Sequence, residues 1–122
     1  MDKQQIFDTV ATHLLKQGKP ALSAEGFCRY RTDGGLKCAV GVLISDDKYD
    51  GKMEGESIYD RKVQKGLPFP VTEEDVGFLR RLQSAHDIAL KDSGIEAWKE
   101  QMRLIAAENG LNAEVLDVAH SG

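Results

Sequence analysis

The sequence predicts a small α+β domain, residues 1–122, in which one β-hairpin packs against about three main helices. Three observations lead to this prediction. Apolar residues recur at helical spacing near the start of the chain and again in its second half. Between these parts lie two short segments of strand-like composition, separated by a glycine turn. The length is that of one domain.

The first predicted element is an amphipathic helix over residues 3–17. Its apolar face is formed by Ile6, Phe7, Val10, Ala11 and Leu14. Asp2 precedes this helix and is a favourable N-cap residue, whereas Gly18 and Pro20 follow it and end it.

A β-hairpin is predicted next, with strands at 27–31 and 36–40. A three-residue loop at 33–35 keeps most apolar side chains on one face, and Gly35 supplies the left-handed residue that such a loop requires. The pairs in this register are Thr32 with Leu36, Tyr30 with Cys38, and Cys28 with Val40. The segment 39–44 is equally compatible with a short helix, because periodicity alone does not separate the two structures.

The second half of the chain is predicted to be mainly helical. Residues 56–64 are expected to form a short helix, and the proline-containing segment 66–70 interrupts the chain. Thr72 is the N-cap of the next helix, which has acidic residues in its first turn and ends at Ser93 and Gly94. The apolar face of this helix carries Val76, Leu79, Leu82, His86, Ala89 and Leu90.

A last long helix is predicted over residues 95–109, followed by Gly110 as its C-terminal stop. Its apolar face carries Trp98, Met102, Ile105 and Ala106. A short final turn is expected over 112–119.

Composition restricts the class of function. The chain has 16 Lys and Arg against 20 Asp and Glu, so nucleic acid is disfavoured as a partner, because duplex binding needs a basic face. The longest apolar run, 38–44, is far shorter than the roughly 20 residues of a transmembrane helix. No signal peptide is apparent, so we expect a soluble cytoplasmic protein without a membrane partner. The sequence does not indicate an oligomeric state.

Cys28, Cys38, His86 and Asp87 are the candidate catalytic residues. A thiolate beside a histidine base and an orienting carboxylate is the pattern of nucleophilic catalysis. The alternative is that both cysteines pack as small apolar residues and that His86 is a hydrogen-bonded core histidine. The chain lacks the local signature of a cysteine protease, and no cofactor is predicted.

The same residues offer an alternative zinc site. Cys28, Cys38 and His86 supply three of the four ligands that a structural zinc ion takes. The fourth would have to be Asp87, His13 or His120. A disulfide between the two cysteines is disfavoured, because the predicted register places them diagonally across the hairpin.

A calcium site in the loop beginning at Asp46 is not predicted. Asp46, Asp50 and Gly51 match positions of the EF-hand loop, but Lys48 stands where an oxygen ligand is needed and Ser57 stands where the motif has glutamate. A solvated turn is the better interpretation of this segment.

Two charged surfaces are predicted to bind a partner. Arg29, Arg31 and Lys37 share one face of the hairpin, which suits an anionic ligand or a carboxylate-rich protein surface. The acidic residues, which would attract a basic partner surface, are Asp46, Asp47, Asp50 and Glu54. For both surfaces the alternative is a hydrated face without a partner.

Several short motifs carry a resemblance in combination. They are Cys-Arg-Tyr-Arg at 28–31, Gly-Leu-Lys-Cys-Ala-Val-Gly at 35–41, Tyr49-Asp50, Met53-Glu54-Gly55 and His86-Asp87. Over residues 5–110 the chain resembles a group of small phage, prophage and bacterial proteins to which no activity is assigned. The resemblance implies a bacterial or phage cytoplasm and an accessory gene rather than a core metabolic enzyme.

The predicted function is binding rather than catalysis. Small phage accessory proteins often bind a host protein, including components of host defence, so we expect this chain to bind and occlude a bacterial host protein. One alternative is a small-molecule-binding protein or enzyme, with Cys28, Cys38, Tyr30 and His86 lining a pocket between hairpin and helix. A second alternative is a zinc-stabilised structural module.

Overall fold

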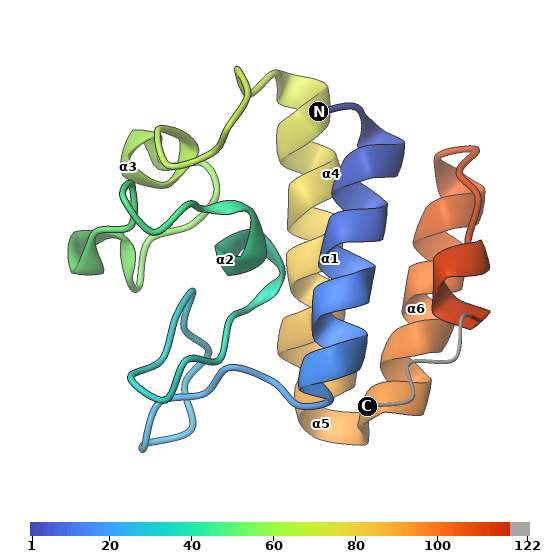
Figure 1. Cartoon of the computed structure of the whole chain (residues 1–122), viewed down its shortest axis with the longest axis horizontal. Coiled ribbons are helices and arrows are strands. Elements are labelled where there is room, and N and C mark those ends of the chain that lie inside the picture. The colour runs from blue at the N-terminus through green and yellow to red at the C-terminus, as the bar shows by residue number, and fades with distance from the viewer. Residues whose placement is uncertain (118–122) are drawn as a thin grey trace.

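The computed structural model describes residues 1–117 and is built from helices and loops (Figure 1). Three long helices form a bundle: α1 (Lys3–Gln17), α4 (Glu73–Ser84) and α6 (Ile95–Glu108). The shorter elements are α2 (Ala39–Leu43), η1 (Gly51–Met53), α3 (Arg61–Gln64), η2 (Ala85–Leu90), α5 (Lys91–Ser93) and η3 (Glu114–Asp117). We call residues 18–72 the loop region and the remaining described residues the bundle. The loop region lies on one side of the bundle, on the left in Figure 1.

The predicted α+β class is wrong, because the described residues form no β-sheet. The register of the turn is nevertheless as expected at its tip: Arg31 bridges Lys37, and the Thr32 N–H donates to the Leu36 carbonyl at 2.9 Å. The pairing stops at Cys38, where α2 begins. The segment around Cys28 pairs backwards with Leu22 instead of forwards with Val40. Two small turns therefore replace the hairpin.

Helix α2 forms within segment 39–44, whose sequence is compatible with either a strand or a short helix. Cys38 is its N-cap, and the Sγ atom accepts the Gly41 N–H at 3.3 Å. Helical spacing buries Ala39, Val40 and Leu43 together. Gly41 permits this packing, since a Cβ atom there would lie 2.0 Å from the Tyr30 carbonyl oxygen. Helix α2 packs against both α1 and α4 and so joins the loop region to the bundle.

The helices of the bundle agree with the sequence predictions. Helix α1 has the predicted bounds: the Asp2 carboxylate accepts the Gln5 N–H at its start, and Gly18 adopts φ 70° at its end. Thr72 caps α4 as expected. The predicted helix over 95–109 is observed as α6, with Trp98 at its buried centre. The predicted helix over 56–64 is reduced to α3, and the predicted final turn extends past the described residues.

The second long helix contains a π-helical segment. Helix α4 continues without a break through η2 into α5 and ends at Gly94, as predicted. Within η2 the Lys91 N–H reaches back to the His86 carbonyl, which adds one residue to the turn. Such π-helical insertions are frequent at functional sites.

Among residues 1–117, no helix combines the length and the apolar character that crossing a bilayer requires.

Candidate functional site

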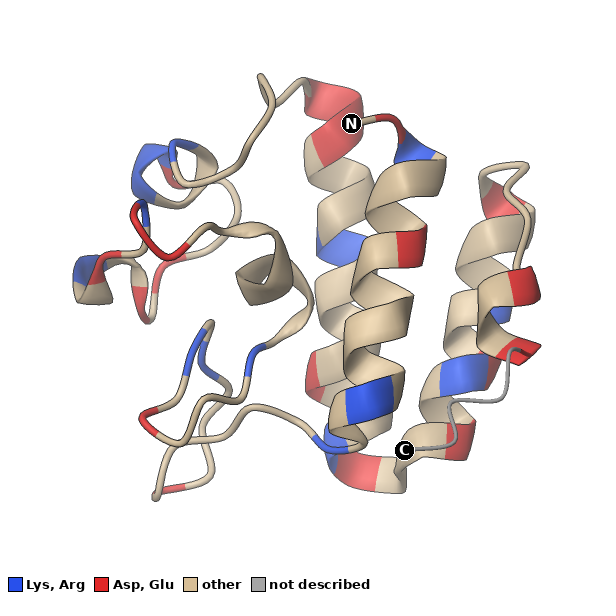
Figure 2. Ribbon diagram, in the orientation of Figure 1, with Lys and Arg blue, Asp and Glu red and all other residues tan. Residues whose placement is uncertain are grey.

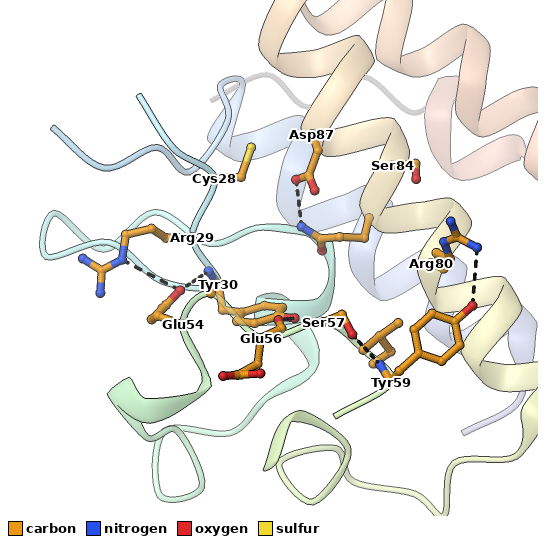
Figure 3. Close-up of a pocket in the computed structure, with 13 residues that line it drawn as sticks. Cys28, Arg29, Tyr30, Glu54, Glu56, Ser57, Tyr59, Arg80, Ser84 and Asp87 are labelled. Carbon is orange, nitrogen blue, oxygen red and sulfur yellow. Dashed lines mark hydrogen bonds and ion pairs between the residues drawn. The ribbon is translucent and has the colours of Figure 1, made fainter. Parts of the chain in front are cut away.

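A pocket of about 320 Å³ opens where the loop region meets the bundle. Segments 28–30 and 54–59 form two of its walls, and residues of α4 and η2 form the third (Figure 3). Its lining residues are Cys28, Arg29, Tyr30, Glu54, Gly55, Glu56, Ser57, Ile58, Tyr59, Arg80, Gln83, Ser84 and Asp87. Figure 3 shows Arg29 and Arg80 at opposite ends of the pocket and the Tyr30 ring between them. The volume lies in the usual range for small-ligand pockets.

The helical wall comes from one stripe of the long helix. Gln83 and Ser84 lie three and four residues after Arg80, and Asp87 lies four and three residues after them, so all four share a face. Gln83 holds two parts of the molecule together. Its Nε2 donates to Asp87 Oδ1 at 2.9 Å, and its Oε1 accepts the backbone N–H of Val40 in α2 at 3.0 Å.

Glu54 fixes the shape of the opposite wall. Its two carboxylate oxygens accept the backbone N–H groups of Tyr30 at 2.8 Å and of Arg31 at 3.1 Å. The Tyr49 hydroxyl also donates to this carboxylate, and the Arg29 guanidinium lies 3.8 Å from it. Glu54 therefore serves mainly to hold two loops together, because its acceptors are occupied by the protein itself.

His86 lies behind the pocket and is fully buried. The backbone N–H of Ala21 donates to its Nε2 at 2.9 Å, and its Nδ1 lies 2.8 Å from Asp87 Oδ1. Since Nε2 accepts from a backbone amide, the proton of the ring is on Nδ1 and is donated to Asp87. Both ring nitrogens are thus engaged, and His86 connects η2 to the start of the loop region.

Cys28, His86 and Asp87, three of the four candidate catalytic residues, lie together. The ligand atoms of these three residues are all within 4.8 Å of one another. The imidazole, however, is already engaged on both nitrogens, by Asp87 on Nδ1 and by the Ala21 N–H on Nε2. Burial first, and then the nearby Asp87 carboxylate, raises the pKa of the Cys28 thiol from 9.0 to about 11. A protonated thiol is a poor nucleophile, so this arrangement does not activate Cys28.

Cys38, the fourth candidate, is separate from this cluster. It is completely buried at the start of α2, and burial raises the pKa of its thiol to about 12. Both cysteines are free thiols. Cys38 therefore acts as a helix cap and a small core residue.

The cluster is a poor fit to zinc. Three donors from Cys28, His86 and Asp87 are one short of a structural site. A metal on Nδ1 would require the ring to lose its proton while Nε2 still accepts the Ala21 N–H. His13, named as a fourth ligand, instead bonds Gln17 on α1, and His120 lies outside the described residues.

The two charged surfaces predicted for binding are partly turned toward each other. Arg31 pairs with Asp46 at 2.7 Å, and its guanidinium stacks 4.9 Å from the centroid of the Tyr49 ring. Arg29 and Glu54 are both lining residues of the pocket. The others remain at the surface: Lys37 is half-buried, and Asp46, Asp47 and Asp50 are exposed.

The sequence interpretation did not identify the rim of the pocket. Tyr59 has 60% of its surface exposed, and the Arg80 guanidinium lies 5.9 Å from the centroid of its ring. The polar stripe at 80, 83, 84 and 87 is a signal that could have located the helical wall. Nothing local in the sequence places Tyr59 opposite that stripe.

Comparison with protein-family models, with curated proteins and with solved structures found no match to this chain.

Proposed function

We propose that this chain is a binding protein without catalytic activity, which captures and occludes a protein of a bacterial host. We further propose that the pocket is its recognition site and receives a basic side chain of the partner. The resemblance to phage and prophage proteins supports a bacterial cytoplasm as the setting. Inhibition of a host defence component is one form that such occlusion would take.

One observation carries the proposal: the catalytic groups at the pocket are held by hydrogen bonds within the protein, whereas the groups suited to recognition are exposed. The groups suited to catalysis are engaged: both nitrogens of His86 have partners, and the Cys28 thiol holds its proton beside Asp87. Groups suited to recognition are accessible. The Tyr59 ring is exposed at the rim, and Asp87 keeps about a third of its side-chain surface accessible.

The acidic residues of the first pocket favour a basic group on the partner. Its acidic lining residues are Glu54, Glu56 and Asp87, against Arg29 and Arg80 at its two ends. Glu56 is exposed and forms no ion pair within the described residues. A lysine or arginine that enters the pocket would meet the partly accessible Asp87 carboxylate and, at the rim, the exposed ring of Tyr59. Tyrosine and arginine are also the residue types that dominate binding energy at interfaces.

The test is affinity capture from bacterial lysate under reducing conditions, with the wild type and two single variants. Tyr59→Ala removes the exposed ring of the pocket. Leu104→Ala removes an apolar side chain of similar exposure, 54%, from α6. We expect the wild type and Leu104→Ala to retain the same protein and Tyr59→Ala to lose it. Equal recovery by all three would remove the pocket from the proposal.

Native mass spectrometry separates the proposal from its small-molecule alternative. A bare-chain mass for the purified protein agrees with a partner that is a protein. An added mass that disappears in an Asp87→Asn variant would instead identify the pocket as a small-ligand site.

A further inference from the structure

A second pocket, of about 400 Å³, lies in the loop region and is lined mainly by lysines. We call it the lysine pocket. Its lining residues are Lys48, Asp50, Lys52, Met53, Lys62, Lys65 and Gly66. It shares no lining residue with the pocket described above. Figure 2 shows basic positions gathered around α3 and the neighbouring loop.

Local packing brings these lysines together. Lys48 precedes η1, Lys52 lies in it, and Lys62 and Lys65 lie in and directly after α3. Helices η1 and α3 are in contact, and Gly66 allows the close approach, since a Cβ atom there would lie 2.9 Å from the Met53 methyl carbon. Met53 and Val63 are buried beneath the lysines. The backbone that carries the lysines is therefore packed against buried apolar residues.

The lysines of the lysine pocket are not held in ion pairs among the described residues. All four lysines are exposed, and within residues 1–117 none of their amines forms a salt bridge. Asp50, the one acidic lining residue, accepts the backbone N–H of Lys52 at 2.9 Å. Nearby Asp60 is similarly occupied as the N-cap of α3. Four lysines and one aspartate thus line this concavity, in a chain whose net charge is −4.

We propose that the lysine pocket binds a compact polyphosphate group, such as the diphosphate or triphosphate of a nucleotide. Lysine binds phosphate as a point charge, and several lysines around one concavity suit several adjoining phosphates. Like charges that line one concavity repel one another, and a bound polyanion removes that repulsion. The concave shape and the volume fit a small ligand rather than the length of a nucleic-acid strand.

The experiment is calorimetric titration of the full chain with inorganic pyrophosphate and tripolyphosphate at low ionic strength. Lys62→Ala/Lys65→Ala removes two charges from the lysine pocket. Lys16→Ala/Lys19→Ala removes the same charge from exposed positions at the end of α1. Circular dichroism and thermal melting of both variants establish that each remains folded.

We expect saturable binding to the wild type, about tenfold or more weaker in the lysine-pocket variant and changed less than about twofold in the control. Equal weakening in both variants would show a general charge effect and overturn the site. Binding that never saturates would overturn it as well. A short duplex DNA that binds and is not displaced by pyrophosphate would replace the compact site with an extended nucleic-acid surface.

Discussion

The bundle and the loop region satisfy their backbone amides in different ways. Most amides of the bundle bond within helices, so its conformation depends on apolar burial spread over three helices. In the loop region many amides close short backbone turns, but single side chains supply the acceptors that connect its segments to one another and to the bundle. Three acceptors come from the bundle: His86 for Ala21, Gln17 for Lys37 and Gln83 for Val40. Glu54 accepts two more amides from within the loop region. The loop region therefore depends on a few individual residues, whereas the bundle does not.

A pair of glycine substitutions gives the largest expected contrast between the two regions. In Gly41→Ala the new Cβ atom would lie 2.0 Å from a backbone oxygen, so α2 must move away from Tyr30. We expect the free energy of unfolding to fall by at least about 3 kcal/mol. Gly77→Ala, in α4, meets nothing within 4 Å and should raise it by about 0.5–1 kcal/mol. Urea denaturation measures both, and a similar loss in the two variants would contradict the contrast.

His86→Ala tests the strongest connection between the regions. It leaves the buried Ala21 N–H without an acceptor and opens a cavity, so we expect a loss of about 2–3 kcal/mol in the free energy of unfolding. His13→Ala, at a half-buried position on α1, should cost less than about 1 kcal/mol. Thermal and denaturant unfolding give both values. Equal losses would mean that His86 contributes only as an ordinary core residue.

Glu54→Gln tests the connection inside the loop region. The amide keeps one acceptor oxygen but loses the charge that two backbone N–H groups and a tyrosine share, so we expect a loss of about 1.5 kcal/mol. Faster protease cleavage within 18–72 should accompany it. Glu56→Gln is the matched control, because that acid is exposed and two residues away. Unchanged cleavage in Glu54→Gln would show that the loops do not depend on this carboxylate.

The smallest expected effect concerns Cys28 at high pH. Its thiol has a pKa near 11 in the folded state, against 9.0 ordinarily, so the folded state holds this proton more tightly. The resulting stabilisation is complete below about pH 9 and is lost as pH rises toward 11. In a Cys38→Ser background, the rate of iodoacetamide labelling should reach half its maximum near pH 11, and Asp87→Asn should lower that midpoint. A midpoint near pH 9 in both would remove the influence of Asp87.

The comparison also explains which parts of the structure the sequence could predict. Helical periodicity and end residues are local signals, so the sequence predicts α1, α6 and the continuous run from α4 through η2 to α5 with nearly their observed bounds. The loop region is held by side chains distant in sequence, such as Gln83 on Val40, and no local pattern encodes these contacts. The hairpin prediction failed for this reason, although its turn register was right.

The candidate site divides in the same way. Residue chemistry alone identified Cys28, His86 and Asp87, and the structure brings their ligand atoms together. It could not show that both nitrogens of His86 are already engaged, since that depends on the backbone N–H of Ala21 and on the neighbouring Asp87. Tyr59 and the lysine pocket depend on how segments 46–66 fold back on themselves, which composition does not reveal.

The walls of the first pocket come from three segments that are far apart along the chain. The pocket therefore exists only while the loop region rests on α4, and a local opening that leaves the bundle folded abolishes it. Any occupant must favour the closed form by mass action, in proportion to its affinity and concentration. Binding at this site is then a local folding equilibrium, and slower hydrogen exchange of loop amides would record it even if the bundle stayed unchanged.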